Sequence, residues 1–182
     1  MVYMWTLTVH GQTQLNQSEA LDALHYLNRI RNNPKAYIDS TRCADLGNVD
    51  AMPALKINPI LQKVAEEKAI DMAQRNYFDH IDKSGEGINI KLHRSGYSLE
   101  AQEYARKSNN YYESLSAGAE SGKEHINELI LDRNVRPPSH RHHLLGMNAF
   151  WGACDEIGIA IAENPDSHYA TYMVIIIARS KK

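Results

Sequence analysis

The chain is short of cysteine, of net charge and of long apolar runs, and each shortage excludes a class of protein. Two cysteines among 182 residues cannot make the set of disulfides that holds small secreted domains together. A single bridge between Cys43 and Cys154 and a pair of buried free thiols both stay open, and we favour the free thiols. A formal net charge of −2 gives no global attraction to nucleic acid. The longest apolar run, residues 173–178, is much shorter than the ~20 residues of a transmembrane helix.

The remaining composition is that of an ordinary globular domain, with 43% hydrophobic and 23% charged residues. A chain of this length can bury most of its apolar surface in one core. Residues 1–11 (MVYMWTLTVHG) are apolar, like the second half of a secretory signal peptide, although the basic start is missing. Their alternation also fits an edge strand, but we favour the signal remnant. This predicts an N-terminal extension over residues 1–15, one domain over residues 16–182, and a protein located outside the cell or in the cell envelope.

Helical signals dominate the first half of the chain. Asn16 and Glu19 have the spacing of a capping box, which predicts a helix that Asn33 and Pro34 end. A second helix begins after Asn58, which can cap it, and has a proline in its first turn. Its buried stripe is predicted from residues at helical spacing: Leu61, Val64, Ala65, Lys68 and Met72.

The last third of the chain changes from helical to strand periodicity. After two prolines, Ser139 is predicted to cap a short helix. Residues 157–162 then alternate bulky and small side chains, residues 164–167 have turn chemistry, and residues 169–178 are predicted as the returning strand. Helices followed by a hairpin predict an α+β domain with a mainly antiparallel sheet.

Two of the nine histidines stand out by their position. His80 follows an aromatic pair just beyond the second helix, and His140 lies at the start of the predicted helix that Ser139 caps. A helix N-terminus disfavours a positive charge, so a neutral imidazole is expected at His140, the form that binds metal or accepts a proton. The chain has neither an H-E-x-x-H pattern nor a G-x-S-x-G elbow, so the sequence gives little support to a hydrolase.

Two acidic residues are candidates to act with these histidines. Glu113 lies between tyrosines and serines, and Asp132 precedes His140 by eight residues. A carboxylate beside imidazoles can be a metal ligand or a proton acceptor. For Asp132 we favour the simpler interpretation, a residue that ends a helix through local hydrogen bonds.

Taken together, these segments resemble the CAP superfamily of cysteine-rich secretory, antigen 5 and pathogenesis-related proteins, in particular its bacterial SCP-like extracellular members. The resemblance covers roughly residues 18–179, and the order and spacing of the motifs carry it. The matching segments are Asn28-Arg29 with Asn33-Pro34, Leu61 through Met72 continuing into Asn76–His80, His93–Tyr97, Tyr112–Gly118, Leu129–Asp132, Ser139–Arg141 with Leu144-Leu145, and Ile157–Ala160.

The resemblance implies a three-layer α-β-α sandwich with a wide cleft, in which two histidines and one or two acids hold a divalent metal in some members. The corresponding cleft residues here are His80, Glu113, His140 and Asp132, with His80 and His140 as the metal ligands and weakly bound zinc as the cofactor. Three hypotheses follow. We favour an exported binding or interaction module that is not an enzyme, whose ligand or protein partner the sequence does not identify. The alternatives are a metal-dependent hydrolase of the protease type and a carrier of a small lipid or sterol.

Overall fold

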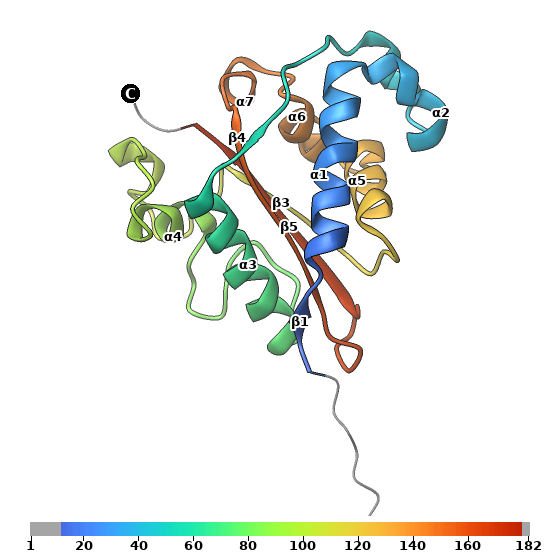
Figure 1. Ribbon diagram of the computed structural model, residues 1–182. Coiled ribbons are helices and arrows are strands. Elements are labelled where there is room, and N and C mark those ends of the chain that lie inside the picture. Colours follow the sequence, from blue (N-terminus) through green and yellow to red (C-terminus); the bar gives the residue numbers. More distant parts are fainter. Residues whose placement is uncertain (1–11, 180–182) are drawn as a thin grey trace, which may run out of the picture.

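The computed structural model describes residues 12–179, and these form helices on both faces of a single sheet (Figure 1). The sheet order is β1-β4-β5-β3, with β2 paired to β4. All pairings are antiparallel except that of β2, which confirms the predicted α+β class with a mainly antiparallel sheet. The strands are β1 (Gln14–Leu15), β2 (Lys56–Ile57), β3 (Glu113–Ala117), β4 (Glu156–Glu163) and β5 (Thr171–Ala178).

The helices divide between the two faces of the sheet. One face carries α3, which contacts β4 and β5, and the other carries α1, α5 and α6, of which α1 contacts β4 and the other two contact β3 (Figure 1). The α-helices are α1 (Gln17–Asn32), α2 (Ile38–Thr41), α3 (Pro59–Gln74), α4 (Ile88–Arg94), α5 (Gly122–Leu131), α6 (Ser139–Leu145) and α7 (Ala149–Gly152). Short 3-10 turns cover Pro34–Tyr37, Ala44–Asn48 and Ala101–Glu103.

The caps of the two long helices are those that the sequence predicts. The side chain of Asn16 accepts a hydrogen bond from the Glu19 amide at 3.1 Å, and that of Asn58 accepts one from the Ile60 amide at 2.9 Å. Glu19 does not complete a capping box, because its carboxylate accepts from the Gly122 amide at 2.7 Å. The residue expected to cap its own helix therefore links α1 to the start of α5.

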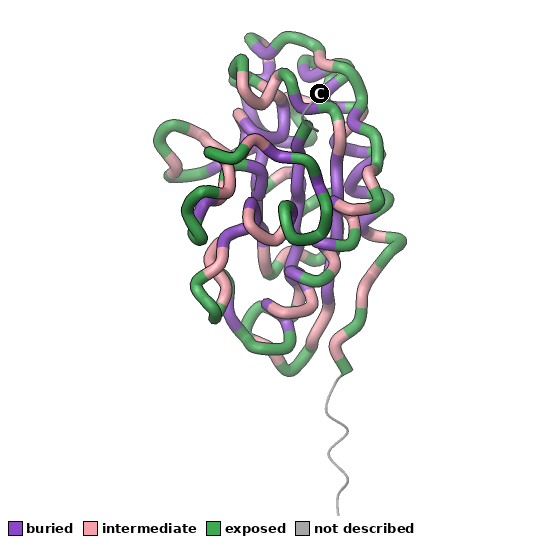
Figure 2. Tube along the Cα trace, turned by 90° about the vertical axis from the view of Figure 1, so that its left-hand side faces the viewer, coloured by how far each residue is buried: buried purple, intermediate pink, exposed green. Residues whose placement is uncertain are grey.

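The core lies between the helices and the sheet, and the strands run through its centre (Figure 2). In β4 the predicted alternation separates Gly158, Ala160 and Ala162 from the three isoleucines, and the pairing of β4 with β5 is as predicted. A Cβ atom on Gly158 would lie 2.2 Å from the backbone of Leu61 in α3. The small face of β4 is therefore what allows α3 to lie against the sheet.

The structure tests the prediction about the cysteines, but it does not test the interpretation of residues 1–11. Both Cys43 and Cys154 are buried and free, as we favoured. Residues 1–11, interpreted as a signal remnant, lie outside the described residues. Gln14 and Leu15, which the sequence places in the N-terminal extension, pair with Glu163 and Ala162 of β4.

Replacing Gly158 with alanine tests the contact between α3 and β4. We expect Gly158→Ala to destabilise the domain by about 3 kcal/mol or more, because the added methyl group meets backbone atoms that cannot rotate away. Gly47→Ala is the matched control, since its Cβ would only touch the end of the Ile38 side chain at 3.7 Å. Urea unfolding measures both, and equal stabilities for the two variants would contradict the packing described here.

Candidate functional site

His80 and Glu113 form a hydrogen-bonded pair, although 33 residues separate them in the chain. His80 lies in the loop after α3, and Glu113 is the first residue of β3. The His80 Nδ1 atom lies 2.8 Å from Glu113 Oε2. The carboxylate side chain has no exposed surface, whereas 41% of the His80 side chain is exposed. Because Nδ1 donates its hydrogen to the carboxylate in this geometry, the neutral ring carries its lone pair on Nε2.

The second carboxylate oxygen of Glu113 can accept a further hydrogen bond or bind an ion. Oε1 is buried and has no hydrogen-bond partner among the described residues. Buried carboxylate oxygens are normally satisfied, so this atom is an acceptor held beside the exposed imidazole of His80. The predicted roles of Glu113 as a metal ligand or base depend on this oxygen, since the other one binds His80.

His140 forms a second pair of the same kind with Asp132. The His140 Nδ1 atom lies 2.8 Å from Asp132 Oδ1, and Asp132 Oδ2 accepts from the His140 backbone amide at 2.9 Å. Asp132 is only 3% exposed and ends α5 in the left-handed conformation, with φ of 51°. Our preferred interpretation of Asp132 as a helix-ending residue therefore describes only part of its role, because the same carboxylate also holds a histidine.

The prediction that Ser139 caps α6 is wrong. Ser139 is the first residue of that helix, Pro138 occupies the capping position, and no side-chain cap is formed there. The Asp132 carboxylate instead accepts the free amide of His140 and, at 3.4 Å, that of Arg141. A residue from the preceding helix thus does the capping, and it draws His140 into the pair at the same time.

A third histidine, His143, is buried against β3 and β5. Its Nδ1 atom is 2.7 Å from Ser114 Oγ, and its Nε2 atom is 3.4 Å from the carbonyl oxygen of Ile177. The pKa of His143 is lowered to about 3, mainly by burial, while the hydrogen bond with the Ile177 carbonyl opposes the shift and the nearby positive charges, Arg31 among them, add to it. His143 is therefore a buried, neutral ring that links β3 to β5.

His125 repeats this arrangement two residues further along β3. Its Nδ1 atom lies 2.8 Å from Ser116 Oγ, and burial lowers the pKa of His125 to about 4. Its Nε2 atom is buried without a partner among the described residues. Neither serine–histidine pair was predicted from the sequence, and the signal was the S-x-S spacing in β3, which puts Ser114 and Ser116 on one face of the strand.

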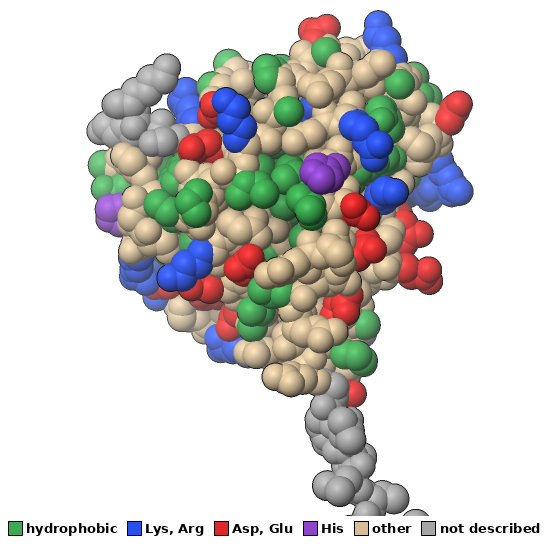
Figure 3. Space-filling model, in the orientation of Figure 1, with side chains coloured by type: hydrophobic (Ala, Val, Ile, Leu, Met, Phe, Trp, Pro, Cys, Tyr) green, Lys and Arg blue, Asp and Glu red, His purple; other side chains and the backbone are tan. Residues whose placement is uncertain are grey.

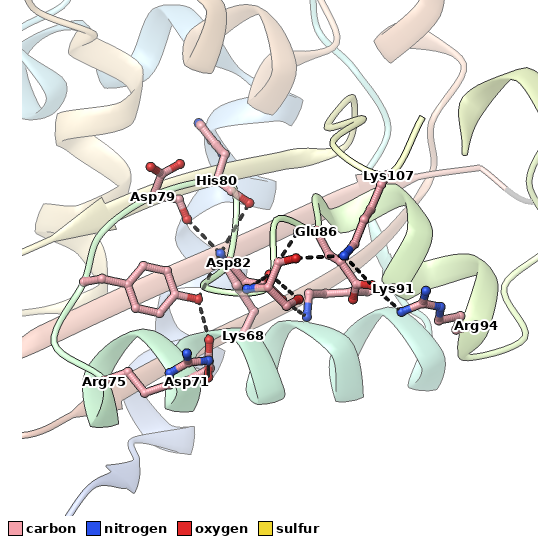
Figure 4. Close-up of polar contacts among 12 residues, drawn as sticks. Lys68, Asp71, Arg75, Asp79, His80, Asp82, Glu86, Lys91, Arg94 and Lys107 are labelled. Atoms are coloured by element: carbon pink, nitrogen blue, oxygen red, sulfur yellow. Dashed lines mark hydrogen bonds and ion pairs between the residues drawn. The ribbon is translucent and has the colours of Figure 1, made fainter. Parts of the chain in front are cut away.

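Lys68 was not recognised from the sequence either, because it was counted in the apolar stripe of α3. It is only 3% exposed, and its Nζ atom donates to the carbonyl oxygens of Asp79 at 2.7 Å and His80 at 3.3 Å (Figure 4). Burial lowers the pKa of Lys68. A lysine at a buried position of a helical stripe was itself the signal that a polar contact lies there.

The loop that carries His80 is fastened on its far side by a network of charges (Figure 4). Asp82 accepts from the backbone amides of Ser84 and Glu86 and pairs with Lys91 at 2.6 Å. Burial opposes ionisation of Asp82, but the Lys91 charge and these hydrogen bonds outweigh it and hold the pKa of Asp82 well below its usual range. The loop is therefore attached to both α3 and α4.

Within residues 12–179, no three side chains of histidine, cysteine, aspartate or glutamate converge as metal ligands. A catalytic zinc centre normally uses three protein ligands and one open position, and the described residues do not fit it. Each pair does have one feature of metal-binding histidines: Nδ1 of the imidazole is hydrogen-bonded to a buried carboxylate, and Nε2 is left to bind an ion. Imidazole nitrogens of this kind can bind an ion weakly or accept a hydrogen bond from a ligand.

Figure 3 shows how charged side chains are distributed over one face of the molecule. Acidic and basic side chains are interspersed on that face, in keeping with the small net charge. One apolar pocket of about 190 Å³ lies between α1, α3 and β4, lined by Leu15, Ala20, Leu24, Ile57, Ile159 and Ile161 among others. In the described part of the chain, no helix is long and apolar enough to cross a membrane.

Comparison with known proteins places these features in a family context. The sequence model of the CAP family, described as the cysteine-rich secretory protein family, matches residues 24–177. The search of curated proteins found no match.

Two solved bacterial structures are similar in fold. An outer surface protein from Borrelia burgdorferi is 18% identical, with a TM-score of 0.62, and the match covers 94% of this chain and 99% of that one. An extracellular protein containing an SCP domain from Bacillus anthracis is 17% identical, with a TM-score of 0.51, and the match covers 88% of this chain and 41% of that one. At these identities the likeness concerns the fold alone.

The two buried histidines make stability depend on pH. His125 and His143 stay neutral in the native state down to about pH 4 and 3, whereas in the unfolded chain they take up protons below about 6.5. The unfolded state then binds more protons, so the free energy of unfolding falls as the pH decreases from about 6.5 to about 4.5, by up to about 1.4 kcal/mol per pH unit for each histidine. Urea unfolding at several pH values measures this slope.

His125→Asn is the variant for this test, because the amide nitrogen of asparagine can take the place of Nδ1 beside Ser116. We expect a shallower slope in this variant and an unchanged slope in His25→Asn, whose side chain is exposed on α1. A native domain whose stability is constant between about pH 7.5 and about pH 4.5 would show that the two rings are not buried as neutral groups.

Proposed function

The chain belongs to the CAP family, and we propose that it works as an exported binding domain without catalytic turnover. The observation that carries the proposal is the pair of carboxylate-anchored histidines, His80 with Glu113 and His140 with Asp132. Each anchor fixes the ring and leaves Nε2 as an acceptor, which suits recognition of a ligand or weak binding of one divalent ion. The two proteins of similar fold, one an outer surface protein and the other an extracellular protein, support a location outside the cell.

The buried serines argue against the hydrolase alternative. Ser114 is hydrogen-bonded to an imidazole, as an activated nucleophile would be, but only 1% of the residue is exposed. A substrate carbonyl cannot reach its Oγ atom without unfolding of the strand. The absence of a three-ligand metal cluster among the described residues removes support for the other route, an activated water. Turnover would therefore need groups beyond those that the two pairs supply.

Zinc calorimetry tests the role of the pairs. We expect the native domain to bind zinc weakly and His80→Ala to bind it more than about tenfold less tightly, the loss that removal of an outer-shell partner alone can cause. His25→Ala, which removes an exposed histidine from α1, should bind like the native domain. Identical isotherms for the native domain and His80→Ala would exclude His80 from metal binding. Cleavage of labelled casein by the native domain with zinc would contradict the absence of turnover.

The apolar pocket supports a second candidate, binding of a lipid chain. Its volume of about 190 Å³ is below the ~300–1,000 Å³ of pockets for drug-sized ligands. It suits one end of an acyl chain better than the ring system of a sterol. Leu21 and Ile57 are about half exposed at its lining and can cover such a chain.

A fluorescent fatty acid tests this candidate by the rise in its emission on binding. Leu21→Asp places a charge at the pocket lining without disturbing the core, and we expect it to weaken binding about tenfold or more. Met147→Asp is the control, because Met147 is a similarly exposed apolar residue away from this pocket. Equal binding by both variants would show that the fatty acid does not use the pocket.

A further inference from the structure

Lys68 of α3 is buried and forms no ion pair within the described residues, although the charge of Glu113 acts on it from a longer distance. No carboxylate in the described residues lies within ion-pair distance of its Nζ atom. The ammonium group instead donates to two consecutive carbonyl oxygens, those of Asp79 and His80, and lies 3.4 Å from the Tyr77 hydroxyl. Burying a charge on these terms costs stability that a methionine or leucine at the same position would not cost. The contact that lysine gains in return is with the backbone of the site.

The geometry of the loop explains what that contact achieves. In Figure 4 the Lys68 ammonium lies at the carbonyl oxygens of Asp79 and His80, and the His80 imidazole points away from it. The Asp79 side chain accepts from the Ile81 amide at 2.9 Å and closes the turn around His80. With its backbone held in this way, His80 directs Nδ1 toward Glu113.

Lys68 is itself held in place by its neighbours. The Tyr77 hydroxyl donates to the Asp71 carboxylate, one turn of α3 beyond Lys68, and Arg75 pairs with the same carboxylate at 3.2 Å. The Nζ atom also lies 5.0 Å from the centre of the Tyr77 ring. Polar contacts thus run without a break from the surface of α3, through Tyr77 and Lys68, to the backbone of His80.

We propose that Lys68 is the positioning residue of His80: it fixes the backbone at Asp79 and His80 so that the imidazole keeps Nδ1 on Glu113 and presents Nε2 outward. The inference rests on the proposed function, in which that Nε2 atom makes the binding contact. Lys68 does not touch the ligand, and its effect passes through the loop. Removing it should therefore change the state of the His80 ring as well as the stability of the domain.

The test reads the ring directly, with the full chain and without ligand. Nitrogen NMR of the His80 side chain distinguishes the tautomer with hydrogen on Nδ1 from the one with hydrogen on Nε2. We expect the native domain to hold the Nδ1–H tautomer, and Lys68→Met to show a mixture of the two. Zinc binding should weaken about tenfold in that variant, in the range found for loss of outer-shell partners. Lys63→Met is the matched control, because its side chain is 72% exposed on the same helix.

A second variant separates loss of position from loss of fold. Lys68→Gln keeps N–H donors at this site, so it should retain part of the Nδ1–H population even if Lys68→Met does not fold. A Nδ1–H tautomer that persists unchanged in a folded Lys68→Met or Lys68→Gln domain would overturn the positioning role and leave the proposed function intact. A native domain with hydrogen on Nε2 would overturn the His80–Glu113 anchor, and with it the proposed function. A native domain with the expected tautomer but no zinc binding would support the positioning role of Lys68 and show that the site does not bind zinc.

Discussion

The close approach of α3 to β4 at Gly158 is the constraint on which the rest of the molecule depends. Because a side chain at this position would meet the backbone of Leu61, the distance between helix and sheet is fixed by main-chain atoms. Everything that α3 carries follows from that distance. Lys68 lies two turns beyond Leu61, and the helix ends just before the loop with His80. The site is thus positioned from a backbone contact at the opposite end of the helix.

The two faces of β3 have different contacts: one packs into the hydrophobic core, and the other binds the buried histidines. Leu115 packs into the core, while Ser114 and Ser116 hold the buried rings of His143 and His125. Glu113, at the start of the strand, reaches His80 in the loop after α3. Tyr112 and Ser114 stand directly before and after this glutamate in the chain. The structure accommodates both, since Tyr112 is fully buried with its hydroxyl on Glu103, and Ser114 is satisfied by His143.

The helices and the hairpin could be predicted from the sequence because their signals are local. Asn16 and Asn58 mark the starts of helices because their side chains accept hydrogen bonds from amides two or three residues away. The alternation of bulky and small residues in β4 lies within eight consecutive residues. The two-residue strands β1 and β2 carry no such pattern and exist only through their pairing with β4.

The site was predictable only as a set of candidates, since its partners lie far apart in the chain. His80 and His140 stood out by position, but their pairing with Glu113 and Asp132 depends on how the loops and helices fold back. His143 and Lys68 were hidden for the opposite reason, because each occupies a buried helical position where an apolar residue is the usual choice. Composition and periodicity identify such positions, and only the three-dimensional contacts explain a charge or a ring in them.

Asp132 has a consequence for how this domain can evolve. One carboxylate ends α5, caps α6 and anchors His140, so any substitution that altered the site there would also loosen the junction of two helices. On the His80 side these roles are divided, since the anchor Glu113 lies on a strand and the loop is held from α3 and α4 by separate residues. Selection for a new ligand therefore has more freedom at His80 than at His140. Divergence between relatives should accumulate first in the loop after α3, with the turn between α5 and α6 changing last.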